Sequence, residues 1–312
     1  MDDLIRQLES AENLNRNKIE LIKNNWAKQR TIQAPLNSDI YNSMTAQQKL
    51  KFRDFLTTKP TRTLSGVSVI AIMTKPAGCV GRCTYCPTSS LAPKSYTGYE
   101  PSSMRARRNN FDSYLIVKNR LSQLKKVGHP TDKNEVIIQG GTFTWMPWDY
   151  QYNFIKRAYD AFNDVDAINL EEAKRINETS NHRVVALVIE TRPDWCKQDH
   201  IQKMLELGAT RCELGLQSTY DYVLDKIKRG HNLDEAKRAI RELKDAGFKV
   251  DLHMMLGLPG SSKELDIDMF RILFEDPDLR PDGLKIYPCG VIKGSELYNI
   301  WKAGEYEPIN DN

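Results

Sequence analysis

The fold of this chain is decided by two neighbouring stretches, Val67-Ser-Val-Ile-Ala-Ile-Met73 and Cys79-Val-Gly-Arg-Cys83-Thr-Tyr-Cys86. The first is a short apolar run rich in β-branched residues, which predicts a buried strand. The second places three thiols on one loop, a pattern that indicates metal binding in a reducing compartment. A ligand-bearing loop directly after a strand is typical of α/β folds that carry their chemistry at the carboxyl ends of the strands.

Further apolar runs alternate with amphipathic segments along the rest of the chain. Because a parallel strand needs a crossover helix before the next one, this alternation predicts an α/β protein with a parallel sheet. Six such units predict a partial (β/α)6 TIM-like barrel. The predicted strands are Val67–Met73, Val136–Gln139, Val184–Glu190, Cys212–Gln217, Val250–Leu256 and Leu284–Tyr287. The predicted helices are Tyr114–Val127, Tyr150–Phe162, His200–Leu207, Leu233–Ala246 and Leu265–Phe274.

The first part of the chain has no strand pattern. Its apolar residues have helical spacing, as in Leu4, Ile5 and Leu8, and Pro35 and Pro60 interrupt it. We therefore expect a small helical module over residues 1–63 and a larger α/β domain over residues 64–312.

Charge is distributed unevenly along the 312 residues, although the formal net charge is only +4. Residues 14–63 hold ten Lys and Arg against three acids, and residues 94–133 hold nine against three. Two basic zones on an otherwise acidic chain indicate a polyanion partner such as nucleic acid, and a solvated helix face is the alternative. No stretch approaches the roughly 18 apolar residues of a membrane helix, and the acidic start Met1-Asp-Asp3 is unlike a signal peptide, so we expect a cytoplasmic protein without a membrane partner.

Three of the six cysteines, Cys79, Cys83 and Cys86, have the spacing C-x3-C-x2-C. Three thiolates can hold three irons of a [4Fe–4S] cluster and leave the fourth iron open, whereas a structural zinc site needs four ligands. We therefore predict an iron–sulfur cluster. Zinc remains the alternative if a distant ligand such as Cys289 or a histidine completes the site.

The cysteine spacing, with Tyr85 before the last thiol and a strand before the loop, resembles the radical S-adenosylmethionine (radical SAM) superfamily. The resemblance implies a partial barrel of the radical SAM type, in which the open iron binds the amino and carboxylate groups of S-adenosylmethionine. Gly140-Gly141-Thr142, after the second predicted strand, is similar to the glycine-rich segment that approaches the methionine amino group in that superfamily.

Eight further motifs, in order along nearly the whole chain, resemble one family, the catalytic subunit of Elongator, a tRNA carboxymethyluridine synthase. They are Ser95-Tyr-Thr-Gly-Tyr-Glu-Pro101, Gly128-His-Pro-Thr-Asp-Lys133, Gly140-Gly-Thr-Phe143, Ile189-Glu-Thr-Arg-Pro-Asp194, Glu213-Leu-Gly-Leu-Gln-Ser218, Lys228-Arg-Gly-His231, His253-Met-Met-Leu-Gly-Leu-Pro259 and Asp282-Gly-Leu-Lys-Ile-Tyr-Pro288.

The family resemblance implies a reaction. Family members cleave S-adenosylmethionine reductively to a 5′-deoxyadenosyl radical, which takes hydrogen from the methyl group of acetyl-CoA. The carbon radical adds to C5 of the wobble uridine (U34) of tRNA, and hydrolysis of the thioester leaves carboxymethyluridine. An external reductant is implied as well.

The resemblance also implies residue roles. Lys133 is the expected acetyl-CoA contact, with a solvated lysine as the alternative. We expect His253 to be a core histidine bonded to the backbone, and Tyr96, Tyr99, Trp145 and Trp148 to be stacking or packing aromatics. The candidates for S-adenosylmethionine contacts, for some of which an ordinary ion pair is the alternative, are Gly140, Gly141, Thr142, Glu190, Arg192, Glu213 and Gln217. The candidates for RNA phosphate contacts are Lys18, Lys23, Lys28, Arg30, Arg105, Arg107 and Arg108, with Lys118, Arg120, Lys125 and Lys126 beside them.

The sequence departs from the family in two places. The family separates its first two cysteines more widely and follows the third with Pro-Gly-Gly, where this chain has Pro87-Thr-Ser-Ser90. We also expect the acetyltransferase-like domain to be absent. The sequence is then a fragment of a longer protein, or a separate acetyltransferase or accessory subunit supplies the acetyl-CoA module, or the protein has another role. Two other functions stay open: a radical enzyme with a different RNA or small-molecule substrate, and a non-catalytic tRNA-binding module with a structural metal.

Overall fold

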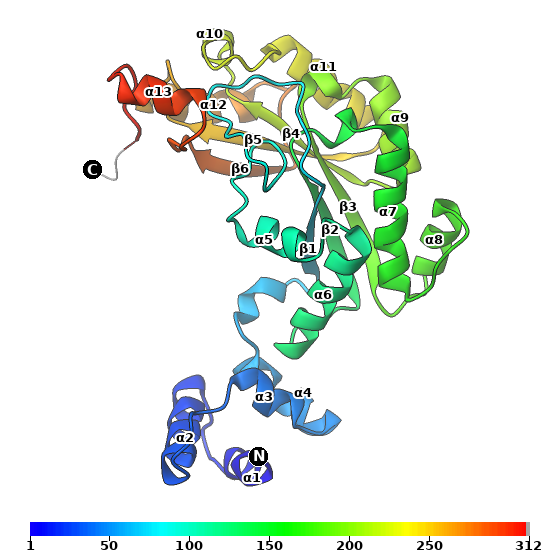
Figure 1. Cartoon of the computed structure of the whole chain (residues 1–312), viewed down its shortest axis with the longest axis vertical. Coiled ribbons are helices and arrows are strands. Elements are labelled where there is room, and N and C mark those ends of the chain that lie inside the picture. Colours follow the sequence, from blue (N-terminus) through cyan, green and yellow to red (C-terminus); the bar gives the residue numbers. More distant parts are fainter. Residues whose placement is uncertain (310–312) are drawn as a thin grey trace. The chain divides into compact units, whose positions relative to one another are not determined.

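The computed structural model describes residues 1–309, the side chain of Pro60 excepted. Its centre is a six-stranded sheet in the order β1-β2-β3-β4-β5-β6, which curls into a partial barrel (Figure 1). The partial (β/α)6 barrel predicted from the sequence is therefore confirmed. The strands are β1 (Ser68–Met73), β2 (Lys133–Gln139), β3 (Arg183–Thr191), β4 (Arg211–Gln217), β5 (Lys249–Leu256) and β6 (Gly283–Pro288).

Helices follow the strands and cover the outside of the sheet (Figure 1). Helix α11 (Leu233–Asp245) illustrates why they form. The side chain of Asn232 caps its amino end, and one face is buried through Ala236, Ala239, Ile240 and Leu243. The helices of this part are α5 (Pro101–Arg108), α6 (Ser113–Lys126), α7 (Trp148–Asn163), α8 (Leu170–Asn177), α9 (Gln198–Glu206), α10 (Asp221–Lys226), α11 (Leu233–Asp245), α12 (Lys263–Glu275) and α13 (Glu296–Lys302).

The register of the central strands aligns polar side chains beside one another. Glu190 on β3 pairs with Glu213 on β4, and His253 on β5 pairs with Lys285 on β6. Strand β4 is buried along nearly its whole length, as expected for a strand in the middle of a parallel sheet. The sheet therefore carries two carboxylates and two basic groups on four consecutive strands.

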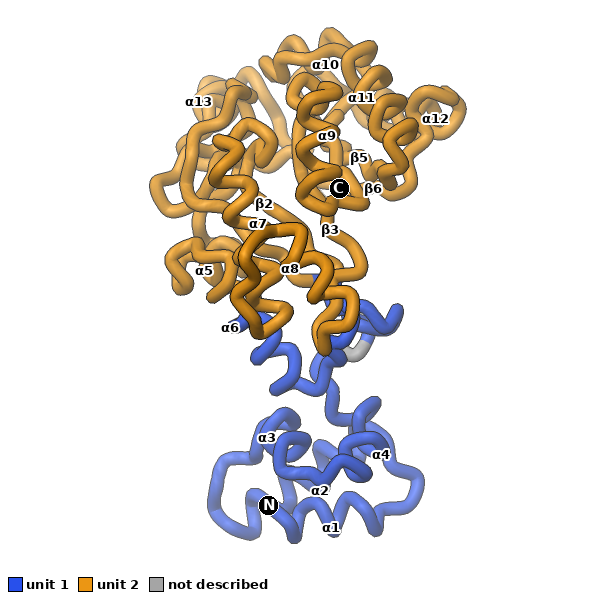
Figure 2. The backbone as a smooth tube through the Cα atoms, turned by 90° about the vertical axis from the view of Figure 1, so that its right-hand side faces the viewer, with its two compact units in different colours: residues 1–69, 118–134 blue, residues 70–117, 135–312 orange. Residues whose placement is uncertain are grey.

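The chain divides into two compact units, coloured in Figure 2. Unit 1 comprises residues 1–69 and 118–134, and unit 2 comprises residues 70–117 and those described from 135 onward. The amino-terminal helices of unit 1 enclose their own apolar core, which includes Leu4, Leu8, Ile19 and Phe52. These helices are α1 (Asp2–Glu9), α2 (Arg16–Gln29), α3 (Asn37–Asn42), α4 (Ala46–Leu56) and the 3-10 turn η1 (Pro60–Thr63). Within residues 1–309, no helix combines the length and apolar character that crossing a bilayer requires.

Candidate functional site

A cavity of about 350 Å³ lies in unit 2 at the carboxyl ends of the strands. Cys79, Cys83 and Cys86 line it from the loop after β1, and residues from the ends of β2 to β6 line it from the sheet. The cavity therefore occupies the position where enzymes built on parallel βα units carry their chemistry. It brings together these predicted contacts for S-adenosylmethionine: Gly141, Thr142, Glu190, Arg192, Glu213 and Gln217.

All three cysteine sulfurs lie within hydrogen-bond distance of nearby polar groups, beginning with Cys79 and Cys86. The backbone N–H of Gly81 donates to Cys79 Sγ at 3.3 Å, and the Thr142 hydroxyl lies 3.3 Å from the same sulfur. The Ser95 hydroxyl lies 3.2 Å from Cys86 Sγ. Donors placed around a thiol stabilise its thiolate form, which is the form that ligates iron.

The Cys83 sulfur lies near two guanidinium groups. Arg229 Nη1 donates to its sulfur at 3.4 Å, and Arg192 Nη1 lies 3.7 Å from the same atom. A hydrogen bond from Cys86 lowers the pKa of the Cys83 thiol to about 4, and the charges of Arg229 and Arg192 add to this effect against the opposing effect of burial. The same contact with Cys83 and burial raise the pKa of Cys86. One anionic sulfur is thus already stabilised by the protein itself.

The three cysteines fit an iron–sulfur cluster better than a single zinc ion. Among the described residues, Glu190, Glu213 and His253 form the one group of three or more potential ligands close enough to share an ion, and no histidine or fourth cysteine gathers with the three thiols. A tetrahedral zinc site needs four ligands around one point, whereas a [4Fe–4S] cluster accepts three thiolates spread around a larger body. The donors around the three sulfurs also suit an anionic cluster.

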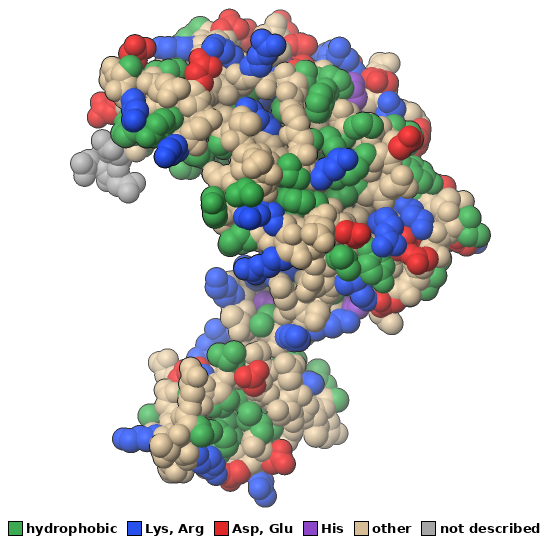
Figure 3. Space-filling view, in the orientation of Figure 1, with side chains coloured by type: hydrophobic (Ala, Val, Ile, Leu, Met, Phe, Trp, Pro, Cys, Tyr) green, Lys and Arg blue, Asp and Glu red, His purple; other side chains and the backbone are tan. Residues whose placement is uncertain are grey.

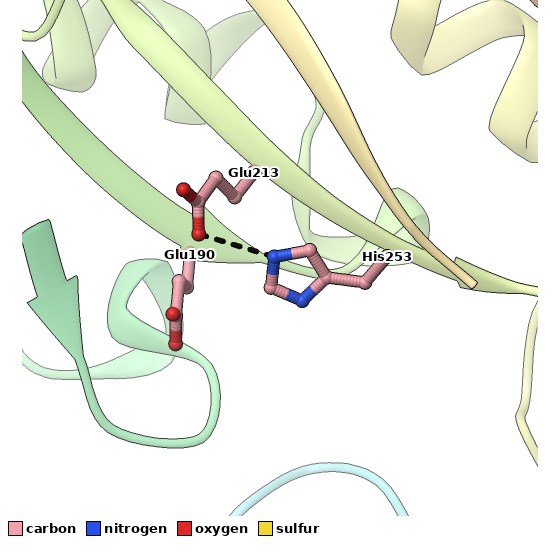
Figure 4. A group of neighbouring side chains, drawn as sticks. All are labelled: Glu190, Glu213 and His253. Atoms are coloured by element: carbon pink, nitrogen blue, oxygen red, sulfur yellow. Dashed lines mark hydrogen bonds and ion pairs between the residues drawn. The ribbon is translucent and has the colours of Figure 1, made fainter. Parts of the chain in front are cut away.

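Three further side chains that line the cavity, Glu190, Glu213 and His253, come from β3, β4 and β5 and are drawn in Figure 4. His253 Nε2 lies 3.1 Å from a carboxylate oxygen of Glu213, and the Lys285 ammonium group donates to the same oxygen. Lys285 Nζ is 3.8 Å from Glu190, whose other oxygen accepts from the Tyr96 hydroxyl at 3.4 Å. The expectation that His253 bonds to backbone is therefore wrong: its imidazole pairs with a carboxylate because the sheet register brings β4 and β5 side chains together.

The two carboxylates of this group differ in ionisation. Burial raises the pKa of Glu190, against the attraction of His253 and Lys285. Burial opposes the ionisation of Glu213 as well, but its hydrogen bond with His253 and the charge of Lys285 lower its pKa. Because the two pKa values are displaced in opposite directions, Glu190 can hold a proton more readily than Glu213, which can act as a hydrogen-bond acceptor.

Gly140 at the end of β2 and Gln217 at the end of β4 have unusual backbone conformations beside the cavity. Gly140 has φ +143°, and a Cβ there would lie 2.0 Å from Thr74 Oγ1, so this position requires glycine. Gln217 has φ +79°, and its Oε1 is buried without a hydrogen-bond partner within residues 1–309. An unpartnered buried acceptor beside a cavity favours a bound ligand that donates to it.

Other predicted site residues lie outside this cavity. Lys133 is exposed at the amino end of β2, the opposite end of that strand from Gly140. Of the four predicted aromatics, Tyr96 lines the cavity, whereas Tyr99 is 70% exposed and Trp148 packs edge-on against Tyr152. Trp145 is partly exposed in the turn after β2.

Several predicted RNA contacts have structural partners. Lys23 is buried, with its ammonium group 2.7 Å from Glu20 and 2.9 Å from Asn37. Arg30 pairs with Asp3 at 2.6 Å and stacks on Trp26. The remaining predicted cations on helices α2 and α5 are at least partly exposed: Lys18, Lys28, Arg105, Arg107 and Arg108.

Unit 1 contains a second, more open basic groove of about 490 Å³. Its lining includes Tyr41, Lys49, Arg53, Lys125 and His129. No acidic side chain of residues 1–309 forms an ion pair with its two lysines or with Arg53. Figure 3 shows Lys and Arg side chains gathered around α6 on the face that it presents. Charge without an internal partner is available to an external anion.

Arg229, His231 and Lys285 were not singled out in the sequence analysis, although all three belong to quoted motifs. Arg229 is 6% exposed and lines the cavity from the loop after α10. Its Nε donates to His231 Nε2 at 3.1 Å, so His231 is a neutral acceptor. The signal available in the sequence was the Arg229-Gly-His231 segment, which lies in a loop after a short helix and has no helical or strand periodicity that would indicate burial.

We expect acid to destabilise the protein partly through His231. Burial, followed by the charge of Arg229, lowers the pKa of His231 from 6.5 to about 3. Between about pH 3 and pH 6.5 the imidazole of His231 is protonated in the unfolded chain but neutral in the folded protein. The free energy of unfolding is therefore unaffected by this group above pH 6.5 and decreases as pH falls, by about 2 kcal/mol at pH 5. The urea midpoint of His231→Gln should therefore fall less between pH 7.5 and pH 5 than that of the unchanged protein. An equal fall in both proteins would contradict this assignment.

The family of the chain follows from comparison with known proteins. The model of the radical SAM superfamily matches residues 73–272, and that of the Radical_SAM C-terminal domain matches residues 281–312. The chain therefore belongs to the radical SAM superfamily. Membership implies a [4Fe–4S] cluster and S-adenosylmethionine, in agreement with the cysteine-lined cavity.

The relatives are more specific than the superfamily. The chain is 48% identical over its full length to a tRNA uridine(34) acetyltransferase of Methanocaldococcus jannaschii, and 40% identical over 98% of its length to Elongator complex protein 3 of Homo sapiens. It covers 59% and 58% of those two proteins, so it spans less than two thirds of their length. A solved structure of the Methanocaldococcus infernus Elp3, with residues 1–46 deleted, matches 78% of this chain and is itself covered to 50%, with a TM-score of 0.68 and 48% identity.

Proposed function

We propose that this chain is the radical SAM core of a tRNA-modifying enzyme that carboxymethylates C5 of the wobble uridine with acetyl-CoA as co-substrate. The observation that carries the proposal is the cavity in which three cysteine thiols with hydrogen-bond donors face a group of polar side chains at the ends of β2 to β6. The relatives named for uridine(34) of tRNA support the choice of substrate.

In this proposal Cys79, Cys83 and Cys86 hold the cluster. When bound, the cluster supplies the electron for reductive cleavage of S-adenosylmethionine. Gly140, where a Cβ would meet Thr74, is a proposed backbone contact of the ligand, and Oε1 of Gln217, which has no partner within residues 1–309, accepts a hydrogen bond from the ligand. The other proposed ligand contacts are Gly141, Thr142, Glu190, Arg192 and Glu213.

The remaining contacts concern the two substrates. Glu213 holds a negative charge and Glu190 retains a proton more readily, so the pair offers an acceptor and a donor beside the cavity. Lys133 stays the proposed phosphate contact for acetyl-CoA. An acetyltransferase module or accessory subunit is a proposed partner for this step.

For tRNA we propose phosphate contacts by the basic groove of unit 1 together with the exposed cations of α2 and α5. Lys23 is left out, because its ammonium group is already paired inside unit 1. Phosphate contacts position RNA without reading its sequence, so selection of the uridine belongs to the cavity in unit 2.

The groove gives a quantitative prediction for tRNA binding. Lys49→Ala with Lys125→Ala should weaken binding by about tenfold at moderate salt and reduce the slope of log K against log salt by about two, because two phosphate contacts are lost. Filter binding of tRNA at several salt concentrations measures both. The double variant Lys197→Ala with Lys263→Ala, outside the two basic zones, is the matched control; equal effects in both would indicate a diffuse charge effect instead of a groove.

The proposed function is tested on anaerobically purified protein loaded with iron and sulfide. Dithionite and S-adenosylmethionine are added, and 5′-deoxyadenosine is quantified with and without acetyl-CoA and tRNA. We expect product, with stimulation by tRNA over free nucleosides. An intact cluster without product in any condition would favour a structural role for the metal, and product stimulated by other substrates would favour a different radical enzyme.

A further inference from the structure

Arg229 is a buried cation, and within the described part of the chain no carboxylate neutralises its charge. It is 6% exposed, and its guanidinium group donates to the Gly215 carbonyl, to His231 Nε2 at 3.1 Å and to Cys83 Sγ at 3.4 Å. The carbonyl and the imidazole are neutral, and no Asp or Glu of residues 1–309 forms an ion pair with Arg229. Burying an uncompensated charge costs several kcal/mol, so a compensating anion is required.

The neighbouring Arg192 provides an internal comparison. It also lies near Cys83 Sγ, at 3.7 Å, but its Nε and Nη2 form a fork to the two carboxylate oxygens of Asp194 at 2.9 and 2.8 Å. Arg192 Nη2 also donates to the backbone carbonyl of Arg229 at 2.6 Å and so fixes the loop that carries it. Arg192 is therefore neutralised by a carboxylate, whereas the anion available to Arg229 is the sulfur.

The backbone around Arg229 is built to admit its guanidinium group. A Cβ on Gly215 would lie 2.5 Å from Arg229 Nη2, inside van der Waals contact. Gly215 lies on the buried strand β4, where a side chain would ordinarily add packing. Because Gly215 has no side chain, the Arg229 guanidinium group occupies that space and lies within hydrogen-bond distance of Cys83 Sγ.

From this geometry we infer that Arg229 is a positioning residue that supplies the counter-charge to the Cys83 end of the cluster and raises the cluster's reduction potential. The one-electron reduction of the cluster from the 2+ to the 1+ state adds negative charge, and a fixed cation with an N–H···S bond stabilises the more negative state. The electron comes from the external reductant, and no proton or bond at Arg229 changes. This inference rests on the proposed cluster site.

The test is a potentiometric titration of the loaded protein with dithionite, followed by electron paramagnetic resonance of the reduced cluster. In Arg229→Gln, which removes the charge, we expect the reduction equilibrium to become about tenfold less favourable, a fall in midpoint potential of about 59 mV for a one-electron couple. Arg229→Lys, which keeps the charge but loses the planar fork, should restore a large part of the shift. Arg211→Gln removes an arginine that pairs with Asp251 and should leave the potential unchanged.

Each outcome decides between the inference and its alternatives. Iron bound in all variants with unchanged potentials would overturn the role of Arg229, while leaving the cluster site intact. Loss of iron in Arg229→Gln but not in Arg229→Lys, with unchanged circular dichroism, would support a charge that the cluster requires. Loss of folded protein in both variants would show a structural role instead and overturn the inference. Absence of iron from the unchanged protein would overturn the proposed function itself.

Discussion

Cys83→Ala is expected to abolish stable cluster binding and with it the formation of 5′-deoxyadenosine. The sulfur of Cys83 lies between two guanidinium groups and is the thiol with the pKa lowered to about 4, so it is the ligand best stabilised as a thiolate. Two remaining thiolates hold two irons and leave the cluster open to loss. Iron and acid-labile sulfide, measured after anaerobic reconstitution, should both fall to near background.

Cys212→Ala is the matched control for this experiment. Cys212 is fully buried on β4 and does not line the cavity, so its replacement should leave iron and sulfide content unchanged. Equal iron in Cys83→Ala and in the unchanged protein would contradict the cluster assignment. One equivalent of zinc without sulfide in the unchanged protein would instead support the zinc alternative.

Glu213→Gln is expected to lower the free energy of unfolding by about 3 kcal/mol. Glu213 is 2% exposed and faces both Lys285 and His253. Removal of its charge takes the anionic partner away from His253 and from the Lys285 ammonium group, whose side chain is 30% exposed, and leaves a neutral amide at a buried position. Urea unfolding of unit 2, followed by tryptophan fluorescence, measures the loss.

A second substitution separates loss of the ion pair from loss of packing. Lys285→Met in the Glu213→Gln background removes the unpaired charge and should recover about half of the lost stability. Asp268→Asn, at an exposed carboxylate paired with Arg271, is the control and should leave the urea midpoint nearly unchanged. If Glu213→Gln lowers the free energy of unfolding no more than Asp268→Asn does, the ion pairs of the buried Glu213 carboxylate do not stabilise the fold.

Much of the fold could be predicted from the sequence because buried strands and amphipathic helices leave periodic patterns. Every predicted strand is present, although β2 begins at Lys133 instead of Val136 because its first residues are polar. The helices without a prediction are α5, α8, α10 and α13, which have eight residues or fewer and too few turns to show a period.

The site was less predictable because its contacts join distant parts of the chain. The cysteine loop and the glycine segment have local signatures, but Arg229 meets Cys83 across 146 positions of sequence. Lys23 has the same spacing as its exposed neighbours, and only packing of α2 shows that it is buried with Glu20 and Asn37. The pairing of His253 with Glu213 likewise depends on the register of two strands.

The sequential order β1 to β6 of the sheet also bears on how the protein matures during synthesis. Each strand pairs with the one translated just before it, so the sheet can extend by one βα unit at a time as the chain leaves the ribosome. The cysteine loop follows the first strand, whereas Gly215 and Arg229 belong to the fourth strand and the segment after it. The three thiols therefore emerge long before Arg229, and the contact between Arg229 and Cys83 can form only after β4 and the segment that follows it have been synthesised.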